Sequence, residues 1–301
     1  MIDILLATYN GEKFIKTQIY SILSQSYKNW RLIVHDDQSS DNTINIVHEL
    51  AQHDNRIILI EDNIKCGSPA SNFRHLTKFS TSEYVMFCDQ DDIWLDNKIQ
   101  MLYDAIKKYE NDKPVVIYSN AYLWYQEEKI NRLVVGFIAR RLEDFLFLNG
   151  GIQGCSTIFN RQMLNCINSY KGNCAMHDHL LQFIGCAFGH IGFVNTPLLL
   201  YRQHQYNYTQ SKAFESGVFQ RLVKHRHIPV MTKSHFVANI EMINTFYSSL
   251  SEHNKQLCKA YKLMSHSNIF IRIFYVMHYG FTLFGSKFKL IQKIILRKYF
   301  E

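Results

Sequence analysis

The chain has 301 residues, of which 47% are hydrophobic and 20% are charged, and its formal net charge is +7 at pH 7. This composition excludes a disordered chain, and the length is sufficient for one large domain with an appendage. The seven cysteines include no Cys-x-x-Cys pair, and the opening residues, MIDILLATYN, lack the basic start and long apolar stretch of a signal peptide. We therefore expect reduced cysteines in a cytoplasmic protein, and no nucleic-acid partner.

Strands and helices alternate over the first hundred residues. Short apolar runs predict four strands, at residues 2–7, 31–35, 56–61 and 84–88. Apolar residues at helical spacing, such as Ile15, Ile19 and Ile22, predict helices between them. This alternation is typical of right-handed βαβ units, so we predict an α/β fold with a mostly parallel central sheet flanked by helices. Polar loops follow three of the strands, at the edge where open α/β sheets bind ligands.

Three carboxylates follow the fourth strand directly. The uncharged run YVMFC ends in Asp89, Asp91 and Asp92. Closely spaced carboxylates repel one another unless a cation or protons intervene. Oxygen ligands in a short loop favour Mg²⁺ or Mn²⁺, which commonly bridge to substrate phosphates. The pattern thus predicts a divalent metal site, and the alternative is an acidic turn that caps the next helix.

The pattern loosens beyond residue 115 into mixed short strands and helices. We predict one domain over residues 1–210, with a nucleotide-binding part over about 1–115 and an acceptor-side part over about 116–210. Residues 211–301 form a predicted helical C-terminal region.

A basic amphipathic helix is predicted near the C-terminus. Lys289, Lys293 and Arg297 recur at four-residue spacing. A different face carries Phe288, Ile291, Ile295 and Tyr299. Such a helix suits an anionic bilayer surface, so we expect a peripheral protein on the inner face of the cell membrane. The alternative is that its apolar face packs on the first domain or on a second subunit of a homodimer.

Four segments taken in order resemble the inverting glycosyltransferases of family 2, which have the GT-A fold. They are ATYNGEKFIKTQIYSILSQSY, HDDQSSDNT, DQDD, and MHDHLL followed by YRQHQYN. The resemblance covers about residues 1–210 and is closest to bacterial enzymes that extend O-antigen or capsule sugars on a lipid carrier. It implies a metal-dependent hexosyltransferase acting on a nucleotide-sugar donor, with a UDP-hexose favoured and dTDP-rhamnose open. The implied acceptor is a hydroxyl of an undecaprenyl-type lipid-linked glycan.

The resemblance assigns the nucleotide to residues after the first two strands. Ala7 and Tyr9 match positions near the base, and Asp37 matches the acid that binds a uracil-type base. A ring can stack on a base while a carboxylate accepts its N–H. The alternatives are a packed loop tyrosine and an ordinary polar turn. The family commonly has glycine after the acid pair where this chain has Gln38, which leaves open whether Asp36 or Asp37 makes the contact.

The DQDD segment is implied to hold the cation. Asp89 contacts ribose or a metal-bound water in this scheme, and Asp91 ligates the Mn²⁺ or Mg²⁺ that holds the donor diphosphate. Asp92 is expected behind them or against the sugar. A departing nucleoside diphosphate gains negative charge, which a divalent cation stabilises directly.

The resemblance implies that Asp178, in MHDHLL, is the general base. Inversion requires a group on the acceptor side that takes the proton of the attacking hydroxyl. Two alternatives stay open. His177 and His179 are a candidate zinc pair, and Asp178 is a candidate helix cap.

Arg202 and His204 follow the apolar run PLLLY in YRQHQYN. Related enzymes place an arginine here against phosphate oxygens and a histidine near the metal, so we expect Arg202 to bind the donor and His204 to ligate the cation. The alternative for His204 is an incidental surface position. The glycine-containing loop at residues 150–157 is expected to line the acceptor side, or to be a structural turn.

The sequence leaves two other functions open. A sugar nucleotidyltransferase also places acids around Mg²⁺ on an α/β fold, but it needs a glycine-rich phosphate loop after the first strand, where this chain has TYNGEKF. A noncatalytic carbohydrate-binding or assembly protein would have no use for acids at three strand ends.

Overall fold

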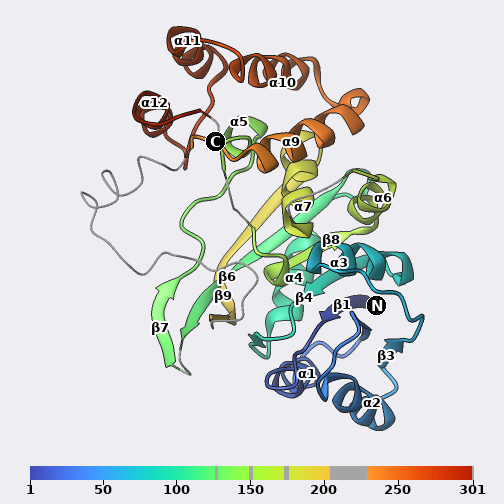
Figure 1. Cartoon of the computed structure of the whole chain (residues 1–301). Helices are drawn as coiled ribbons and strands as arrows, with labels where there is room; N and C mark the ends of the chain where they lie inside the picture. The colour runs from blue at the N-terminus through green and yellow to red at the C-terminus, as the bar shows by residue number, and fades with distance from the viewer. Residues whose placement is uncertain (126–127, 149–151, 173–175, 204–228, 300–301) are drawn as a thin grey trace.

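The computed structural model describes residues 1–125, 128–148, 152–172, 176–203 and 229–299 (Figure 1). The strands are β1 (Ile2–Thr8), β2 (Trp30–Asp36), β3 (Ile57–Ile60), β4 (Tyr84–Cys88), β5 (Ile93–Trp94), β6 (Val115–Tyr125), β7 (Glu128–Leu133), β8 (Thr157–Asn160) and β9 (His190–Gln203). The helices before β9 are α1 (Ile15–Leu23), α2 (Thr43–His53), α3 (Pro69–Leu76), α4 (Lys98–Ile106), α5 (Leu142–Phe145), α6 (Arg161–Ser169) and α7 (His177–Ala187). The helices after it are α9 (Lys233–Thr245), α10 (Glu252–Met264), α11 (Ile269–Tyr279) and α12 (Lys287–Leu296).

One mixed sheet runs through the described part of the chain in the order β3-β2-β1-β4-β8-β6-β9-β5, with β7 paired to β6. The strands β3, β2, β1 and β4 are mutually parallel, as are β6 and β9. The strand β8 is antiparallel to both β4 and β6. The predicted α/β fold is therefore confirmed, with a parallel first half in which the four predicted strands are β1 to β4.

Alternate side chains of the strands point to opposite faces of the sheet, as the two-residue period of a strand requires. Leu5, Ile33 and Val85 pack with α3 and α7 on one face. Ile4 and Val34 pack with α1, α2 and α4 on the other. Helices thus cover both faces of the sheet in its parallel half.

The parallel strands end level with one another. Ala7 of β1 pairs with His35 of β2, and Leu6 of β1 pairs with Cys88 of β4. The backbone N–H of Asp37 then donates to the carbonyl oxygen of Thr8 at 2.9 Å. The loops after β1, β2 and β4 consequently meet at one edge of the sheet.

The helices α9 to α12 lie at the end of the molecule opposite α1 and α2 (Figure 1). Their buried side chains, including Met242, Tyr261 and Val276, belong to the same hydrophobic cluster as α7 and one face of the sheet. The predicted helical C-terminal region is confirmed for residues 229–299. The division of the chain at about residue 210 stays a prediction, since residues 204–228 lie outside the described ranges.

A buried carboxylate joins the parallel strands to each other. Asp3 of β1 is fully buried and accepts hydrogen bonds from Nε and Nη2 of Arg31, both at 2.9 Å. It also accepts from the Oγ of Ser80 at 2.8 Å and from the backbone N–H groups of Thr81 and Ser82. Asp3 therefore fixes β2 and the start of β4 against β1.

Replacing Asp3 with asparagine is expected to lower the free energy of unfolding by about 2–4 kcal/mol, because Arg31 loses its counter-charge in a partly desolvated place. Burial raises the pKa of Asp3, but hydrogen bonds from Arg31 and Ser82 outweigh it and hold the pKa below the usual 3.8. The stabilisation is therefore complete above the pKa of an unfolded aspartate and is lost as the pH falls below it. Denaturant titrations should show the wild-type and Asp3→Asn stabilities converging as the pH is lowered from 7 to 3. An equal difference at both pH values would contradict this account.

Candidate active site

A cavity of about 750 Å³ lies at the ends of the parallel strands. Its lining includes five residues singled out from the sequence, namely Ala7, Tyr9, Asp37, Asp89 and Asp91. Tyr9 leaves about half of its surface exposed, at 52%. The level strand ends thus bring these residues into one cavity, as the pattern of polar loops predicts.

The two acids after β2 have different surroundings. The carboxylate of Asp36 accepts hydrogen bonds from the Oγ1 of Thr8 at 2.8 Å and from the backbone N–H and Oγ of Ser39 at 2.7 and 2.6 Å. Through these hydrogen bonds, Asp36 stabilises the turn that follows β2. Asp37 lines the cavity. Gln38, at the position where the family commonly has glycine, adopts a left-handed backbone conformation with φ of 62°.

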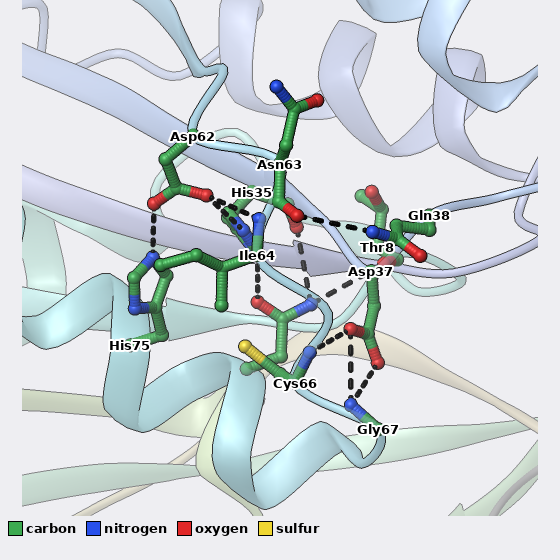
Figure 2. A network of polar contacts seen from close by, with 11 residues as sticks. Thr8, His35, Asp37, Gln38, Asp62, Asn63, Ile64, Cys66, Gly67 and His75 are labelled. Atoms are coloured by element: carbon green, nitrogen blue, oxygen red, sulfur yellow. Dashed lines mark hydrogen bonds and ion pairs between the residues drawn. The ribbon is translucent and has the colours of Figure 1, made fainter.

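The carboxylate of Asp37 is held by the loop that follows β3. It accepts the backbone N–H of Cys66 at 2.5 Å and that of Gly67 at 2.9 Å, as Figure 2 shows. A carboxylate has about four lone-pair directions, so two or so remain for a ligand in the cavity.

The loops after β1 and β4 are joined by Gln90. Its side-chain oxygen accepts the backbone N–H of Tyr9 at 2.9 Å, and its side-chain nitrogen donates to the Tyr9 carbonyl oxygen at 3.0 Å. A Cβ on Gly11 would lie 2.4 Å from that side-chain oxygen, so only glycine fits there without moving Gln90. Gln90 therefore fixes the position of Tyr9 relative to the acids on either side of it.

An acidic cluster includes Asp89, which lines the cavity, and Asp92, which does not. Ligand atoms of Asp89, Asp92 and Cys155 lie within 4.8 Å of one another. Burial raises the pKa of Asp89 to about 7, and the charges of Asp91 and Asp178 contribute to the shift. Burial also raises the pKa of Asp92, and its Oδ2 makes no hydrogen bond within the described residues. The repelling carboxylate oxygens suit a divalent cation. The third member of the group is the Cys155 thiol, and the predicted ligand Asp91 is not part of it.

Asp178 lies in the first turn of α7. Its carboxylate accepts backbone hydrogen bonds from Gly154, from His179 and from its own N–H, while burial raises its pKa to about 6. The helix N-cap is Met176, so Asp178 is not the cap residue. Because the charge of Asp178 raises the pKa of Asp89, the two carboxylates belong to one electrostatic site.

Arg202, at the end of β9, is joined to the acidic segment. Its backbone N–H donates to Oδ1 of Asp92 at 3.0 Å, and its Nε donates to the carbonyl oxygen of Asp91 at 2.8 Å. The guanidinium also lies 4.9 Å from the ring centroid of Phe14, which lines the cavity. The predicted metal ligand His204 lies outside the described residues.

Comparison with known proteins decides the family. The profile described as "Glycosyl transferase family 2" matches residues 3–167, more than half of the chain. The chain belongs to glycosyltransferase family 2. It is 29% identical over 230 residues to the dTDP-rhamnosyl transferase RfbG of Shigella flexneri, covering 72% of this chain and 78% of that one.

Two further likenesses support the family and its fold. The Escherichia coli protein named UDP-Glc:alpha-D-GlcNAc-diphosphoundecaprenol beta-1,3-glucosyltransferase WfgD is 32% identical over 167 residues, covering 55% of this chain and 62% of that one. A structure of S. aureus TarS 1–349 in complex with UDP-GlcNAc aligns with a TM-score of 0.60 and 16% identity, covering 88% of this chain and 72% of that one. The predicted GT-A fold and glycosyltransferase class are confirmed, and the two other functions considered from the sequence are thereby disfavoured.

The histidines that flank Asp178 in this glycosyltransferase are packing residues. The ring centroids of His177 and Phe73 lie 4.0 Å apart, and those of His179 and Phe145 lie 5.0 Å apart. Burial lowers the pKa of each to about 3, so both are neutral. Positions two apart on a helix point in different directions, and neither histidine belongs to a metal-capable group within the described residues. The zinc-pair alternative is therefore not supported.

One residue of the site escaped the sequence analysis. Lys98 is fully buried at the start of α4, where its Nζ donates to the carbonyl oxygen of Cys155 and lies 3.3 Å from the ring centroid of Trp94. Burial lowers its pKa to about 8, and Asp92 and Asp89 are among the charges that oppose this shift. The available signal was its place one turn before Leu102 on the buried face of the predicted helix.

Proposed function

We propose that this glycosyltransferase moves a sugar, with inversion, from a nucleotide donor to a hydroxyl of a lipid-linked glycan in O-antigen or capsule synthesis. The observation that carries the proposal is the single cavity lined by Tyr9, Asp37, Asp89 and Asp91. Asp178 does not line this cavity, but its charge acts on Asp89. The names of the relatives support it, since one is a dTDP-rhamnosyl transferase and another a UDP-glucose enzyme acting on a diphosphoundecaprenol-linked sugar. A UDP-hexose is the favoured donor and dTDP-rhamnose the second candidate.

The base of the donor is proposed to lie between the loops after β1 and β2. Tyr9 offers an exposed ring for stacking. Asp37 offers a carboxylate that Cys66 and Gly67 already orient, and it can accept the N–H of a uracil or thymine. Ala7 lines the same part of the cavity and leaves room for the base.

Asp89 and Asp91 would hold the Mn²⁺ or Mg²⁺ of the proposed reaction, with Asp92 behind them. The unpartnered Oδ2 of Asp92 and the repulsion among these acids are the observations that fit a cation. When bound, the cation would offset the negative charge that develops on the departing nucleoside diphosphate. Arg202 is proposed to bind donor phosphate oxygens and, through Asp91 and Asp92, to keep the acidic segment in place.

Asp178 is proposed to act as the general base. The acceptor oxygen forms a bond to the anomeric carbon as the bond from that carbon to the diphosphate oxygen breaks, and the acceptor proton passes to the Asp178 carboxylate. The N–H groups of Gly154 and His179 hold this carboxylate in one orientation. A pKa near 6 makes it a stronger base than an ordinary aspartate while leaving it ionised at neutral pH.

The C-terminal helices are proposed to face the membrane that carries the acceptor, with the enzyme peripheral on its inner face. Phe270 and Phe274 of α11 are 79% and 59% exposed, and Phe288 of α12 is 74% exposed. Large apolar side chains exposed together are typical of interaction surfaces. No helix among the described residues is both long and apolar enough to cross a bilayer.

The predicted amphipathic helix is wrong in two respects. First, α12 ends at Leu296, so Arg297 and Tyr299 lie beyond it, and Tyr299 is buried. Second, Lys289 is exposed, but Lys293 is turned inward and donates to the carbonyl oxygen of Val230 at 2.9 Å. Burial lowers the pKa of Lys293 to about 8. The reason is that Leu290 and Ile294 form the buried side of α12, and Lys293 lies next to Ile294 on that side. The proposed membrane contact therefore depends on the aromatic residues more than on a continuous row of lysines.

Incubation with UDP-, dTDP- and GDP-sugars and Mn²⁺ is expected to release nucleoside diphosphate, not pyrophosphate, from one class of donor. Asp91→Ala should lower turnover by about 100-fold or more, because several kcal/mol of charge stabilisation are lost, and a chelator should have a similar effect. The matched control is Asp104→Ala, on the exposed face of α4. Thermal shifts with UDP, dTDP and GDP identify the base, since a ligand of the folded state raises the melting temperature. Wild-type turnover by Asp91→Ala would overturn the metal assignment.

Asp178→Asn is expected to lower kcat by about 10²–10⁴-fold with little change in KM for the donor, because an amide cannot accept the acceptor proton. In the wild-type enzyme, kcat should fall as the pH is lowered through about 6, where Asp178 becomes protonated. Steady-state rates between pH 5 and pH 8, measured with Mn²⁺ saturating at each pH, test both statements. An Asp178→Asn enzyme with unchanged kcat would assign the base to another residue.

Replacing Phe270, Phe274 and Phe288 together with serine is expected to reduce co-sedimentation with phosphatidylglycerol-containing vesicles by about tenfold or more, because apolar burial in the interface drives such binding. The control replaces Tyr20 with serine, since this residue is exposed to 49% on α1, at the other end of the molecule. Equal vesicle binding by the wild-type protein and the triple variant would remove the membrane contact from α11 and α12.

A further inference from the structure

Two histidines and an aspartate lie close together beside the loop that holds Asp37 (Figure 2). Nε2 of His35, at the end of β2, lies 3.2 Å from Oδ1 of Asp62. Nε2 of His75, on α3, lies 2.5 Å from Oδ2 of the same carboxylate. All three ligand atoms lie within 4.8 Å of one another, and none of the three residues belongs to the acidic cluster of the active site.

The hydrogen bonds of Asn72 determine which nitrogen of His35 carries a hydrogen. The Nδ2 of Asn72 points to the carbonyl oxygens of Thr8 and His35, at 3.4 and 3.3 Å. Its Oδ1 therefore faces Nδ1 of His35, at 2.7 Å. Because an amide oxygen only accepts, Nδ1 of His35 must be the donor.

A neutral His35 with hydrogen on Nδ1 directs the lone pair of Nε2 at Asp62. A lone pair facing a carboxylate is repulsive unless a proton or a cation lies between them. His75 directs its own Nε2 at the second oxygen of the same carboxylate. Two imidazole nitrogens and a carboxylate within 4.8 Å of one another are a ligand set that suits first-row transition metals.

The surroundings of the three residues are compatible with a metal site. A metal-bound histidine characteristically donates its other ring N–H to an oxygen, as His35 does to Asn72. Asp62 is oriented by the backbone N–H of Ile64 at 3.0 Å. The side chain of Asp62 is 25% exposed while those of His35 and His75 are 2% and 9% exposed, so an ion has one solvent-facing side for entry.

We propose that His35, Asp62 and His75 bind a transition-metal ion of the Zn²⁺ class, at a site separate from the catalytic cation. Zn–N and Zn–O bonds of about 2.0–2.1 Å would place tetrahedral ligands roughly 3.3 Å apart. The observed separations run to different oxygens of Asp62, 3.2 Å from His35 to Oδ1 and 2.5 Å from His75 to Oδ2. Binding one ion therefore requires His75 to move back from the carboxylate. Water on the exposed side completes the coordination.

The proposed ion would act on the loop that contacts the donor. Asp62 begins the segment that leads to Cys66 and Gly67, whose N–H groups hold the Asp37 carboxylate. Lys65 and Gly67 of the same segment line the cavity. An ion that fixes Asp62 to β2 and α3 therefore restrains this loop in the position that orients Asp37.

The test measures metal binding directly, on protein without a histidine tag. Equilibrium dialysis against Zn²⁺ followed by metal analysis gives the stoichiometry, and Co²⁺ substitution gives visible d–d bands when imidazole ligands bind. Asp62→Asn and His75→Asn remove one ligand each. His48→Ala is the matched control, since His48 faces Glu61 at 3.2 Å on the surface, and Asp91→Ala reports any Zn²⁺ held by the active-site acids.

The expected result is one tightly bound Zn²⁺ per chain and a Co²⁺ spectrum, both retained by His48→Ala and Asp91→Ala. Both should be lost in Asp62→Asn and His75→Asn, and the melting temperature should rise by a few degrees with Zn²⁺ only where binding persists. No bound Zn²⁺ in the folded wild-type protein, or equal binding by folded Asp62→Asn, would overturn the proposal. Because Asp91→Ala is inactive in the scheme above but binds Zn²⁺ in this one, the two proposals fail separately.

Discussion

The site depends on charge repulsion among the acids that follow β4 and Asp178 of α7. Leu6 of β1 lies opposite Cys88 of β4, so Asp89 and Asp91 follow at the same edge of the sheet as the loop after β1. The surrounding protein lowers the dielectric constant there and strengthens the repulsion among them. The pKa of Asp89, raised to about 7 by burial and then by Asp91 and Asp178, reflects the free energy of holding these charges together. A cavity with this property favours ligands that bring positive charge.

Positively charged side chains and backbone N–H groups near the acids partly offset this repulsion. Lys98 contributes a buried cation beneath Asp89 and Asp92, and Arg202 bonds to the backbone of the acidic segment. The N-terminal end of α7 presents its N–H groups to Asp178, where the helix dipole also favours negative charge. None of these groups lines the cavity, so Asp89 and Asp91 stay accessible to a ligand there. The arrangement suits a site in which a positively charged ligand balances the remaining negative charge of the acids.

Local pattern was sufficient for the strands and for the acids at their ends. A run as short as YVMFC is typical of a buried strand and too short for a helix. When parallel strands end level with one another, Asp37 and Asp89 lie at the same edge of the sheet. Lys98 was missed because a lysine on a predicted helix is assigned to solvent unless its buried partners are known. The inward turn of Lys293 was missed for a related reason, since the bond to Val230 joins segments that sequence spacing does not relate. Contacts between distant segments, not local propensity, decide these positions.

The cluster of His35, Asp62 and His75 also could not be predicted from the sequence, because it joins distant segments. Its position gives the loop after β3 a structural role. His35, Asp62 and His75 belong to a strand, a loop and a helix that are separated along the chain, and no spacing motif connects them. The loop residue Asp62 is nonetheless only four positions before Cys66, whose N–H orients Asp37 in the cavity. A carboxylate whose orientation is fixed loses less conformational freedom when it binds a ligand, so a hydrogen bond from that ligand contributes more to affinity. The Asp37 side of the cavity is therefore shaped by a loop that Asp62 joins to His35 of β2 and His75 of α3.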